Sequence, residues 1–189
     1  MGRWEPDTRE RLQNAALELF ERGYDNTTAA EIAERAGTAK STFFRHFADK
    51  REVLFAGTSL IADRAVAAIA AAPPAVTTLG LVDEVLRSIL PIFDPAKRLW
   101  YGRRQAVVAH TPELRERDLL KQHAQTAAIT GALRERGLTG LTADLVAALI
   151  GLAFHVTYTR WLEATADQDV ATLAAEVLAE LRTTVTALT

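Results

Sequence analysis

The stretch AERAGTAKSTFFRHFADKREVL, residues 33–54, decides the fold of this chain. It begins like a helix, breaks at Gly37, and then places basic and hydroxyl side chains among phenylalanines. Two short helices joined by a brief turn that contains glycine are typical of a helix-turn-helix. Residues 36–38 are the expected turn, and the second short helix is predicted from about Lys40 to Phe47. The stretch therefore predicts a segment that reads DNA.

The residues before this stretch predict two further helix starts. Thr28 with Glu31 three residues later has the form of a capping box, in which each side chain accepts a hydrogen bond from the other residue's backbone. Asp7 with Glu10 has the same spacing and predicts the start of a first helix, which Gly23 ends. We therefore expect three helices in the N-terminal part of the chain.

The second short helix of the helix-turn-helix offers side chains that suit contact with DNA. The first residues of a recognition helix reach base edges in the major groove. Lys40 can donate to guanine, and the hydroxyls of Ser41 and Thr42 can bond donors or acceptors on base edges. Phe43 and Phe47 lie four residues apart and are assigned to the core. Thr28, at a helix N-cap, can hold a phosphate. The predicted DNA-contacting residues are Thr28, Lys40, Ser41, Thr42, Phe44, His46 and Lys50.

A simpler interpretation of this cluster is a capped, solvent-exposed helix end. The preceding capped helix, the glycine turn and the surrounding basic residues favour DNA contact instead. Arg45 is interpreted as a solvated or salt-bridged residue. Arg3 and Trp4 suit either an arm in the minor groove or a disordered end, and the second interpretation is preferred.

The composition excludes several classes of protein. The chain has 189 residues, an apolar fraction of 49%, no cysteine and a net charge of −2. This length and apolar content predict a folded core, and the missing cysteines exclude disulfides and thiolate metal sites. Charged residues interrupt the apolar runs, so no membrane-spanning segment is expected, and the N-terminus lacks the apolar core of a signal peptide. We therefore expect a cytoplasmic protein.

The rest of the chain also has helical patterns. The predicted fold class is all-α with about nine helices, because apolar residues recur at helical spacing and strand-like alternation is missing. A three-helix helix-turn-helix domain is assigned to residues 1–50, and a helical bundle for ligand binding and dimerisation to residues 51–189. Asp49 is expected to cap a fourth, long helix that Pro73 stops. Later helices are expected at about Leu79–Leu90, Pro95–His110, Pro112–Arg136, Leu141–Ala164 and Gln168–Leu188.

The stretch from Arg9 to Phe55 resembles the DNA-binding domain of the tetracycline-repressor (TetR/AcrR) family of bacterial regulators. The segments ERGYDNTTAAEIAERAG and KSTFFRHFADKREVLF carry the resemblance. It implies a homodimeric transcription regulator that is not an enzyme, binds a palindromic operator in double-stranded DNA, and is most often a repressor released by a small effector. Two positions depart from the family pattern. Ala39 stands where a capping serine is common, and Phe44 stands where a tyrosine hydroxyl commonly reaches a phosphate.

The last two predicted helices are the candidates for pairing two copies of the chain. One carries Leu145, Leu149, Leu152 and Val156, and the other carries an apolar stripe from Val170 to Val185. Together these faces suit a four-helix interface about a twofold axis. The alternative is that the stripes pack inside one chain. The family resemblance favours the homodimer.

The middle helices mix large aromatic residues with polar ones, as small-molecule pockets do. The predicted effector-binding residues are Phe93, Trp100, Arg103, Val107, His123, Phe154 and Tyr158, although each also suits ordinary core or surface. The segment RRQAVVAHTPELRERDLLKQH resembles the C-terminal domain of mycofactocin-type regulators, which implies a hydrophobic or acyl-CoA-like effector. Arg103 or Arg104 would then hold an anionic head group, or would instead pair with Glu113 or Glu116.

No catalytic or metal site is predicted. His46, His110, His123 and His155 are scattered, and no cysteine accompanies them. Nucleophile-elbow, Walker and dinucleotide-binding patterns are missing, so no cofactor is expected. The alternatives to a repressor are an activator, a regulator without a ligand, or a helical ligand-binding protein or enzyme whose helix-turn-helix is incidental.

Overall fold

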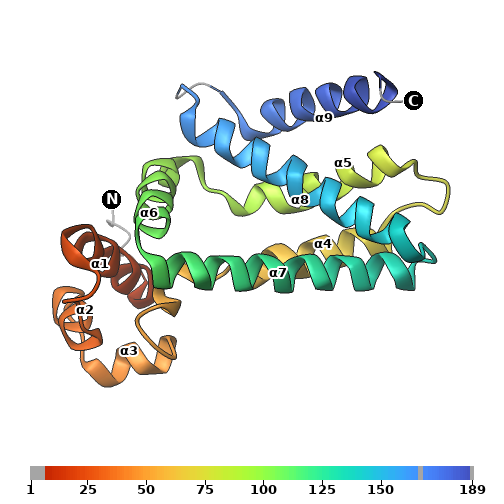
Figure 1. Ribbon diagram of the computed structural model, residues 1–189. Coiled ribbons are helices and arrows are strands. Elements are labelled where there is room, and N and C mark those ends of the chain that lie inside the picture. Colours follow the sequence, from red (N-terminus) through yellow and green to blue (C-terminus); the bar gives the residue numbers. More distant parts are fainter. Residues whose placement is uncertain (1–6, 166–167, 188–189) are drawn as a thin grey trace, which may run out of the picture. The chain divides into compact units, whose positions relative to one another are not determined.

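The structure, a computed structural model, describes residues 7–165 and 168–187, so Arg3 and Trp4 lie outside the described residues. Every regular element in these ranges is a helix, which confirms the all-α prediction (Figure 1). The α-helices are α1 (Thr8–Gly23), α2 (Ala29–Arg35), α3 (Lys40–His46), α4 (Ser59–Ala71), α5 (Thr78–Ile89), α6 (Arg98–His110), α7 (Pro112–Glu135), α8 (Gly140–Glu163) and α9 (Val170–Ala187). The short 3-10 helices are η1 (Glu52–Phe55), η2 (Leu90–Ile92) and η3 (Pro95–Lys97).

The chain divides into two compact units. The first unit contains the described residues up to Gly57 and also Trp100–Leu120. The second unit contains Thr58–Leu99 and the described residues from Lys121 onward. This division differs from the single cut predicted after residue 50, because most of α6 and the start of α7 fold with the helix-turn-helix.

The core of the first unit explains why residues distant in sequence belong to it. Ile32 of α2 and Phe43 of α3 are 0% exposed, and they share one apolar cluster with Val107, Val108 and Leu114. Fully burying a side chain of this size contributes about 1.5–3 kcal/mol. Val107, Val108 and Leu114 lie where α6 is followed by α7, and we call this region the α6–α7 corner. Its burial therefore stabilises the fold of the helix-turn-helix.

The two predicted capping boxes have different outcomes. At the start of α2, Thr28 Oγ1 accepts a hydrogen bond from the backbone N–H of Glu31 (3.2 Å), and Glu31 Oε2 accepts one from the backbone N–H of Thr28 (2.8 Å), which confirms that box. At the start of α1, the side chain of Asp7 makes no capping hydrogen bond, so the predicted box with Glu10 is wrong.

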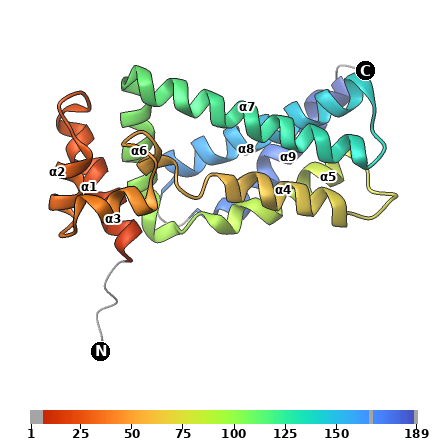
Figure 2. The same ribbon diagram turned by 90° about the horizontal axis from the view of Figure 1, so that it is seen from below.

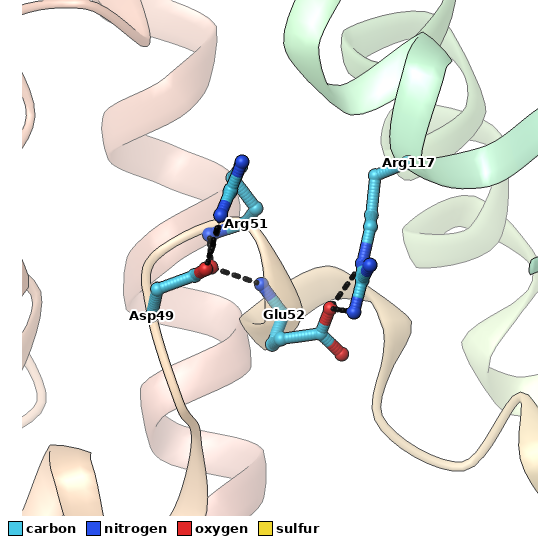
Figure 3. A network of polar contacts seen from close by, with 4 residues as sticks. All are labelled: Asp49, Arg51, Glu52 and Arg117. Carbon is cyan, nitrogen blue, oxygen red and sulfur yellow. Dashed lines mark hydrogen bonds and ion pairs between the residues drawn. The ribbon is translucent and has the colours of Figure 1, made fainter. Parts of the chain in front are cut away.

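The predicted long fourth helix is two separate elements. Asp49 Oδ1 accepts hydrogen bonds from the backbone N–H groups of Arg51 (2.7 Å) and Glu52 (3.2 Å), but the helix that follows is only the short η1 (Figure 3). Gly57 has a φ of +88°, a left-handed conformation that favours glycine and interrupts the helix. The second element, α4, begins at Ser59 and ends before Pro73, where the sequence predicts the stop.

The second unit is a helical bundle. In it α5 packs against α4, α8 and α9, and α8 packs against α9 (Figure 2). The apolar stripe of α9, predicted to pair two chains, is mostly used inside this bundle, because Val170, Leu173, Ala174, Val177 and Leu178 are buried. Val185 is 40% exposed at the end of the same helix. The alternative of packing inside one chain therefore holds for most of this stripe.

Two segments are long and apolar enough to cross a membrane by length and composition, namely Glu52–Ala71 and Gly140–Glu163. Asp63 and Arg64 interrupt the first segment, as expected, whereas the charges of the second, Asp144, Arg160 and Glu163, lie toward its ends. The first segment is broken between η1 and α4. The second segment is α8, whose apolar character has a place in the bundle because one face of this helix is buried against α5 and α9.

Candidate nucleic-acid interface

The turn between α2 and α3 sets the direction of the predicted recognition helix. The backbone N–H of Thr38 donates to the carbonyl of Ala33 (2.9 Å), and that of Gly37 donates to the carbonyl of Glu34 (3.0 Å). Gly37 has a φ of +67°, which residues with a Cβ rarely adopt. Ala39 then stands at the N-cap of α3 without a side-chain capping bond, so Thr38 does not replace the missing cap. An alanine in this position costs about 1 kcal/mol relative to serine.

The outer face of α3 carries exposed cationic, hydroxyl and aromatic groups. Lys40, Ser41 and Arg45 are exposed, and Phe44 is 49% exposed. Lys40 Nζ lies 5.9 Å from the centroid of the Phe44 ring. Residues four apart on a helix lie on the same side, so Ser41 and Arg45 form one edge of this face, and Lys40 and Phe44 form the other. We refer to Lys40, Ser41, Phe44 and Arg45 as the outer face of α3.

Thr42 and His46 flank this face and are half-buried. On the inner side, Phe43 is 0% exposed and Phe47 is 4% exposed, which confirms that they belong to the core. The Phe43 ring contacts both Phe44 and Phe47, with centroids 5.3 Å and 5.4 Å away. The buried phenylalanines therefore fix the rotation of α3 that turns its outer face away from the core.

Arg45 is the cation that sequence reasoning undervalued. It makes no hydrogen bond or ion pair with any residue that the structure describes, whereas Arg35 pairs with Glu18 and Arg51 pairs with Asp49. A free guanidinium on the outer face is available to a phosphate or to a guanine. Its spacing of four residues from Ser41 was the signal in the sequence that could have placed it on this face.

Lys50, predicted to contact the DNA backbone, has its ammonium group bound inside the protein. Lys50 Nζ donates to the carbonyls of Tyr24 (2.9 Å) and Thr27 (3.0 Å), and it lies 4.1 Å from the centroid of the Tyr24 ring. Burial raises the pKa of Tyr24 to about 12, so its ring remains neutral beneath the cation. In this position Lys50 joins the end of α1 to the loop that precedes α2.

The hydroxyl of Thr28 is also engaged. It donates to Glu31 Oε2 (2.8 Å) in addition to accepting the backbone N–H of Glu31. The hydrogen bond from the Thr28 backbone holds the pKa of Glu31 below its ordinary value, so a carboxylate occupies the N-terminus of α2 near neutral pH. Of the seven predicted residues, the structure therefore places Lys40, Ser41 and Phe44 together on an open face, and Thr28 and Lys50 in local bonding networks.

The residues predicted to bind an effector do not form one group. Trp100, Arg103 and Val107 belong to the first unit, whereas Phe93, Phe154 and Tyr158 belong to the second, and His123 is exposed on α7. Phe93, Phe154 and Tyr158 are in mutual ring contact.

The two arginines proposed for an anionic head group serve the first unit instead. Arg103 donates to both carboxylate oxygens of Glu21 on α1 (2.7 Å and 2.6 Å). Arg104 donates to the carbonyl of Leu54 (2.6 Å) and lies over the Phe55 ring, 4.9 Å from its centroid. Arg117 of α7 pairs in the same way with Glu52 of η1 (Figure 3). Arg103 pairs with Glu21 and Arg104 with Asp118 (3.6 Å), so the alternative of a pair with Glu113 or Glu116 is wrong as well.

The Arg103–Glu21 pair predicts a pH dependence. Hydrogen bonds from Arg103 hold the pKa of Glu21 below its ordinary value, so this pair stabilises the fold above that value and the stabilisation is lost as pH falls through the lowered pKa. Between about pH 5 and pH 3, the free energy of unfolding should fall more steeply in wild type than in Glu21→Gln. The difference between the two slopes is small because the side chains of Arg103 and Glu21 are 47% and 34% exposed. Urea denaturation across this range measures it, and equal slopes would contradict the assignment.

Comparison with known proteins agrees with this geometry. Residues 12–57 match the family of bacterial regulatory proteins described as tetR family. The chain is 39% identical over 84 residues to the HTH-type transcriptional regulator TcmR of Streptomyces glaucescens, and the match covers 44% of this chain and 37% of that protein. The chain therefore matches little more than a third of the length of this curated relative.

Solved structures share the fold over most of the chain. A TetR-family transcriptional regulator from Mesorhizobium loti is 22% identical with a TM-score of 0.57, covering 93% of this chain and 94% of that one. The regulator FadR from Bacillus subtilis, solved in complex with stearoyl-CoA, is 21% identical with a TM-score of 0.55, covering 89% of this chain and 95% of that one. The helix-turn-helix region, residues 12–57, is therefore similar to that of the tetR family of bacterial regulatory proteins, and the helical fold is similar to that of these solved structures.

Proposed function

We propose that the protein binds double-stranded DNA as a homodimer and regulates transcription in the cytoplasm, most simply as a repressor at a palindromic operator. The observation that carries this proposal is the outer face of α3, which presents free cationic, hydroxyl and aromatic groups on a rigidly packed helix. A recognition helix needs this combination, because cations contact phosphates while hydroxyl and apolar groups read base edges. No catalytic role is proposed for any residue.

Within this proposal the DNA contacts have different roles. Lys40, Ser41 and Thr42 contact base edges near the N-terminus of α3. Phe44 presents an apolar ring to thymine methyl groups or sugars. Arg45 supplies the second cation. Thr28 and His46 remain candidates at the rim of the interface, and Lys50 positions the helix-turn-helix from inside because its ammonium group already has carbonyl partners.

Dimerisation is proposed through α8 and the outer side of α9. Leu141, Leu145 and Leu152 of α8 are 71%, 54% and 49% exposed, and they recur at helical spacing along one face. Gly151 beside them is exposed and has open space where a Cβ would be, which permits close approach of another helix. Leucines exposed in this way are typical of an interface between subunits.

Replacing Leu145 by glutamate should convert the dimer to a monomer, because a charge at the centre of an apolar interface loses its hydration without gaining a partner. Sedimentation velocity at micromolar concentration measures the change. Leu120→Glu is the matched control, since Leu120 is 53% exposed on α7 and lies outside the proposed interface. A wild-type monomer, or a Leu145→Glu variant that remains dimeric, would contradict the proposed interface.

Control by a small effector is proposed for the second unit, whose aromatic cluster of Phe93, Phe154 and Tyr158 supports it. The FadR structure cited above contains stearoyl-CoA, and a hydrophobic or acyl-type effector is one form of the proposal. An acyl-CoA-like effector would need cations other than Arg103 and Arg104, because both are engaged in the first unit.

In vitro transcription tests the regulatory role and its sign. A duplex selected by the purified protein is placed in two templates. In one it overlaps a promoter, and in the other it lies upstream of the promoter. Repression at the overlapping site is the expected result, and stimulation from the upstream site alone would favour the activator. A variant with both Lys40→Ala and Thr42→Ala should lose either effect. Regulation by that variant without DNA binding would contradict the proposal and favour a ligand-binding protein with an incidental helix-turn-helix.

A further inference from the structure

The second unit contains a cluster of aromatic rings centred on Phe93. The Phe93 centroid lies 5.7 Å from that of Phe154, 5.1 Å from that of Tyr158 and 6.0 Å from that of Trp161. The rings of Phe154 and Tyr158 are stacked, with an interplanar angle of 14°. Phe93 and Trp161 are buried, whereas Phe154 and Tyr158 are half-buried. The stacked pair is therefore the side of the cluster that a small molecule can reach.

A buried hydroxyl without a partner lies one helical turn before Trp161. Thr157 is 0% exposed, and its Oγ1 has no hydrogen-bond partner among the described residues. Thr159 Oγ1 of the same helix also has no partner among the described residues, whereas Thr126 and Thr183 each donate to the carbonyl four residues earlier at 3.0 Å. A buried hydroxyl that makes no hydrogen bond destabilises the fold. The Thr157 hydroxyl therefore has an unused hydrogen-bonding capacity inside the bundle.

Most cations of the second unit are already committed to partners within the described residues. Lys97 and Lys121 interact with other groups, and Arg182 is exposed on α9. The remaining arginines and their partners are Arg64 with the Ser88 carbonyl, Arg87 with Asp83, Arg98 with the Thr165 carbonyl, Arg134 with Asp144, Arg136 with the Ile69 and Ala72 carbonyls, and Arg160 with Glu180. Away from the exposed Arg182, an anionic ligand would have to displace one of these partners to gain a charged contact.

The buried polar groups of the second unit are neutral as well. Among the described residues of this unit, the buried polar or charged ones are Thr130 and Thr157. A carboxylate or phosphate taken into such surroundings loses hydration without gaining a counter-charge, which is unfavourable. A neutral ring system loses little hydration and gains ring contacts with Phe154 and Tyr158.

We propose that the effector is a neutral, flat and largely apolar molecule that packs against Phe154 and Tyr158 and exchanges a hydrogen bond with Thr157. This inference rests on the proposed function, in which the second unit binds an effector. A threonine hydroxyl both donates and accepts, so the polar group of the ligand is a carbonyl or a hydroxyl on the ring system. The sequence suggested an anionic head group held by Arg103 or Arg104. The polar group that we propose is instead neutral and bonds to Thr157.

Matched pairs of ligands test the charge preference. The probes are naphthol against naphthoate, hydroxyanthraquinone against anthraquinone carboxylate, and stearoyl-CoA as an anionic reference. The full chain is titrated with each in a calorimeter, and its melting temperature is recorded with and without the probe. Neutral members should bind and raise the melting temperature, and each carboxylate should bind at least about tenfold more weakly than its neutral partner.

Thr157→Val tests the hydrogen bond with a readout that a purely structural role would not give. Valine keeps the shape of threonine and removes the unpaired hydroxyl, so the melting temperature of the free variant should stay the same or rise. Its affinity for the neutral probes should fall by about fivefold, the effect of losing one neutral hydrogen bond. Thr183→Val, which removes an exposed hydroxyl bonded within α9, is the control and should leave ligand affinity unchanged.

The inference is overturned if the carboxylates or stearoyl-CoA bind as tightly as the neutral probes, if no neutral probe binds, or if Thr157→Val binds them like wild type. DNA binding by the same preparations is measured in parallel. Wild type that binds the neutral probes but no DNA would contradict the proposed function and leave the ligand assignment standing. Wild type that binds DNA but prefers anionic probes would contradict the ligand assignment and leave the proposed function standing.

Discussion

Replacing Leu114 by alanine should lower the free energy of unfolding of the first unit by about 2–5 kcal/mol, the range for deleting a fully buried leucine. Leu114 lies in α7, distant in sequence from the helix-turn-helix, yet it is 0% exposed in the same core as Ile32 and Phe43. A loss of this size is a large part of the stability of an ordinary domain. DNA binding should weaken together with folding, because α3 depends on this core for its orientation.

Urea denaturation followed by circular dichroism measures the effect of Leu114→Ala, and fluorescence anisotropy with a labelled duplex follows DNA binding. Leu119→Ala is the matched control on the same helix, since Leu119 is 59% exposed. Such a surface substitution should change the free energy of unfolding by less than about 0.5 kcal/mol. If the two variants were equally stable, the α6–α7 corner would not be part of the folded DNA-binding unit.

Replacing Arg45 by glutamine should reduce both the affinity for DNA and its dependence on salt. Each phosphate contact contributes about 0.9 to the slope of log Kobs against log salt concentration. A homodimer that loses one such contact in each subunit should therefore show a slope shallower by about 1.8. Titration of the same duplex at several salt concentrations gives the slope directly. An unchanged slope would mean that Arg45 is only a solvated residue, as its sequence context first suggested.

Lys50→Gln provides the contrast to Arg45→Gln. Both variants remove one positive charge, but the Lys50 ammonium group is bonded to the Tyr24 and Thr27 carbonyls. Lys50→Gln should therefore lower the free energy of unfolding, by about 1.5–3 kcal/mol for a hydrogen bond to a charged group, and should leave the salt slope unchanged. If instead the slope fell by the same amount as in Arg45→Gln, Lys50 would contact a phosphate and the assigned roles would be exchanged.

Several parts of the fold that depend on neighbours in sequence were predictable, although the predicted capping box of Asp7 and Glu10 is not formed. The capping box of Thr28 and Glu31, the glycine turn and the spacing of Phe43 and Phe47 are short-range patterns, and each one has the predicted structure. The outer face of α3 follows from these patterns, because burying the phenylalanines leaves Lys40 and its neighbours outside. Such a face can be read from helical periodicity alone.

The parts that depend on distant pairing were not predictable. Arg103 and Glu21 are 82 positions apart, and no local pattern indicates that α6 folds against α1. Lys50 has a side chain that suits a phosphate equally well, and only the three-dimensional position of the Tyr24 and Thr27 carbonyls shows where its charge lies. The lack of a hydrogen-bond partner for Thr157 Oγ1 is likewise a property of the packed bundle, since a threonine hydroxyl in a helix can bond its own backbone.

Selection of bound sequences from a library of random DNA duplexes tests whether the protein reads DNA as a homodimer. The purified protein is mixed with the library at low salt, and the retained duplexes are sequenced. We expect an inverted repeat whose half-sites are centred about one helical turn, about 34–36 Å, apart, because two copies of α3 related by a twofold axis read successive major grooves. Recovery of no motif at low salt, where phosphate contacts are strongest, would contradict this expectation.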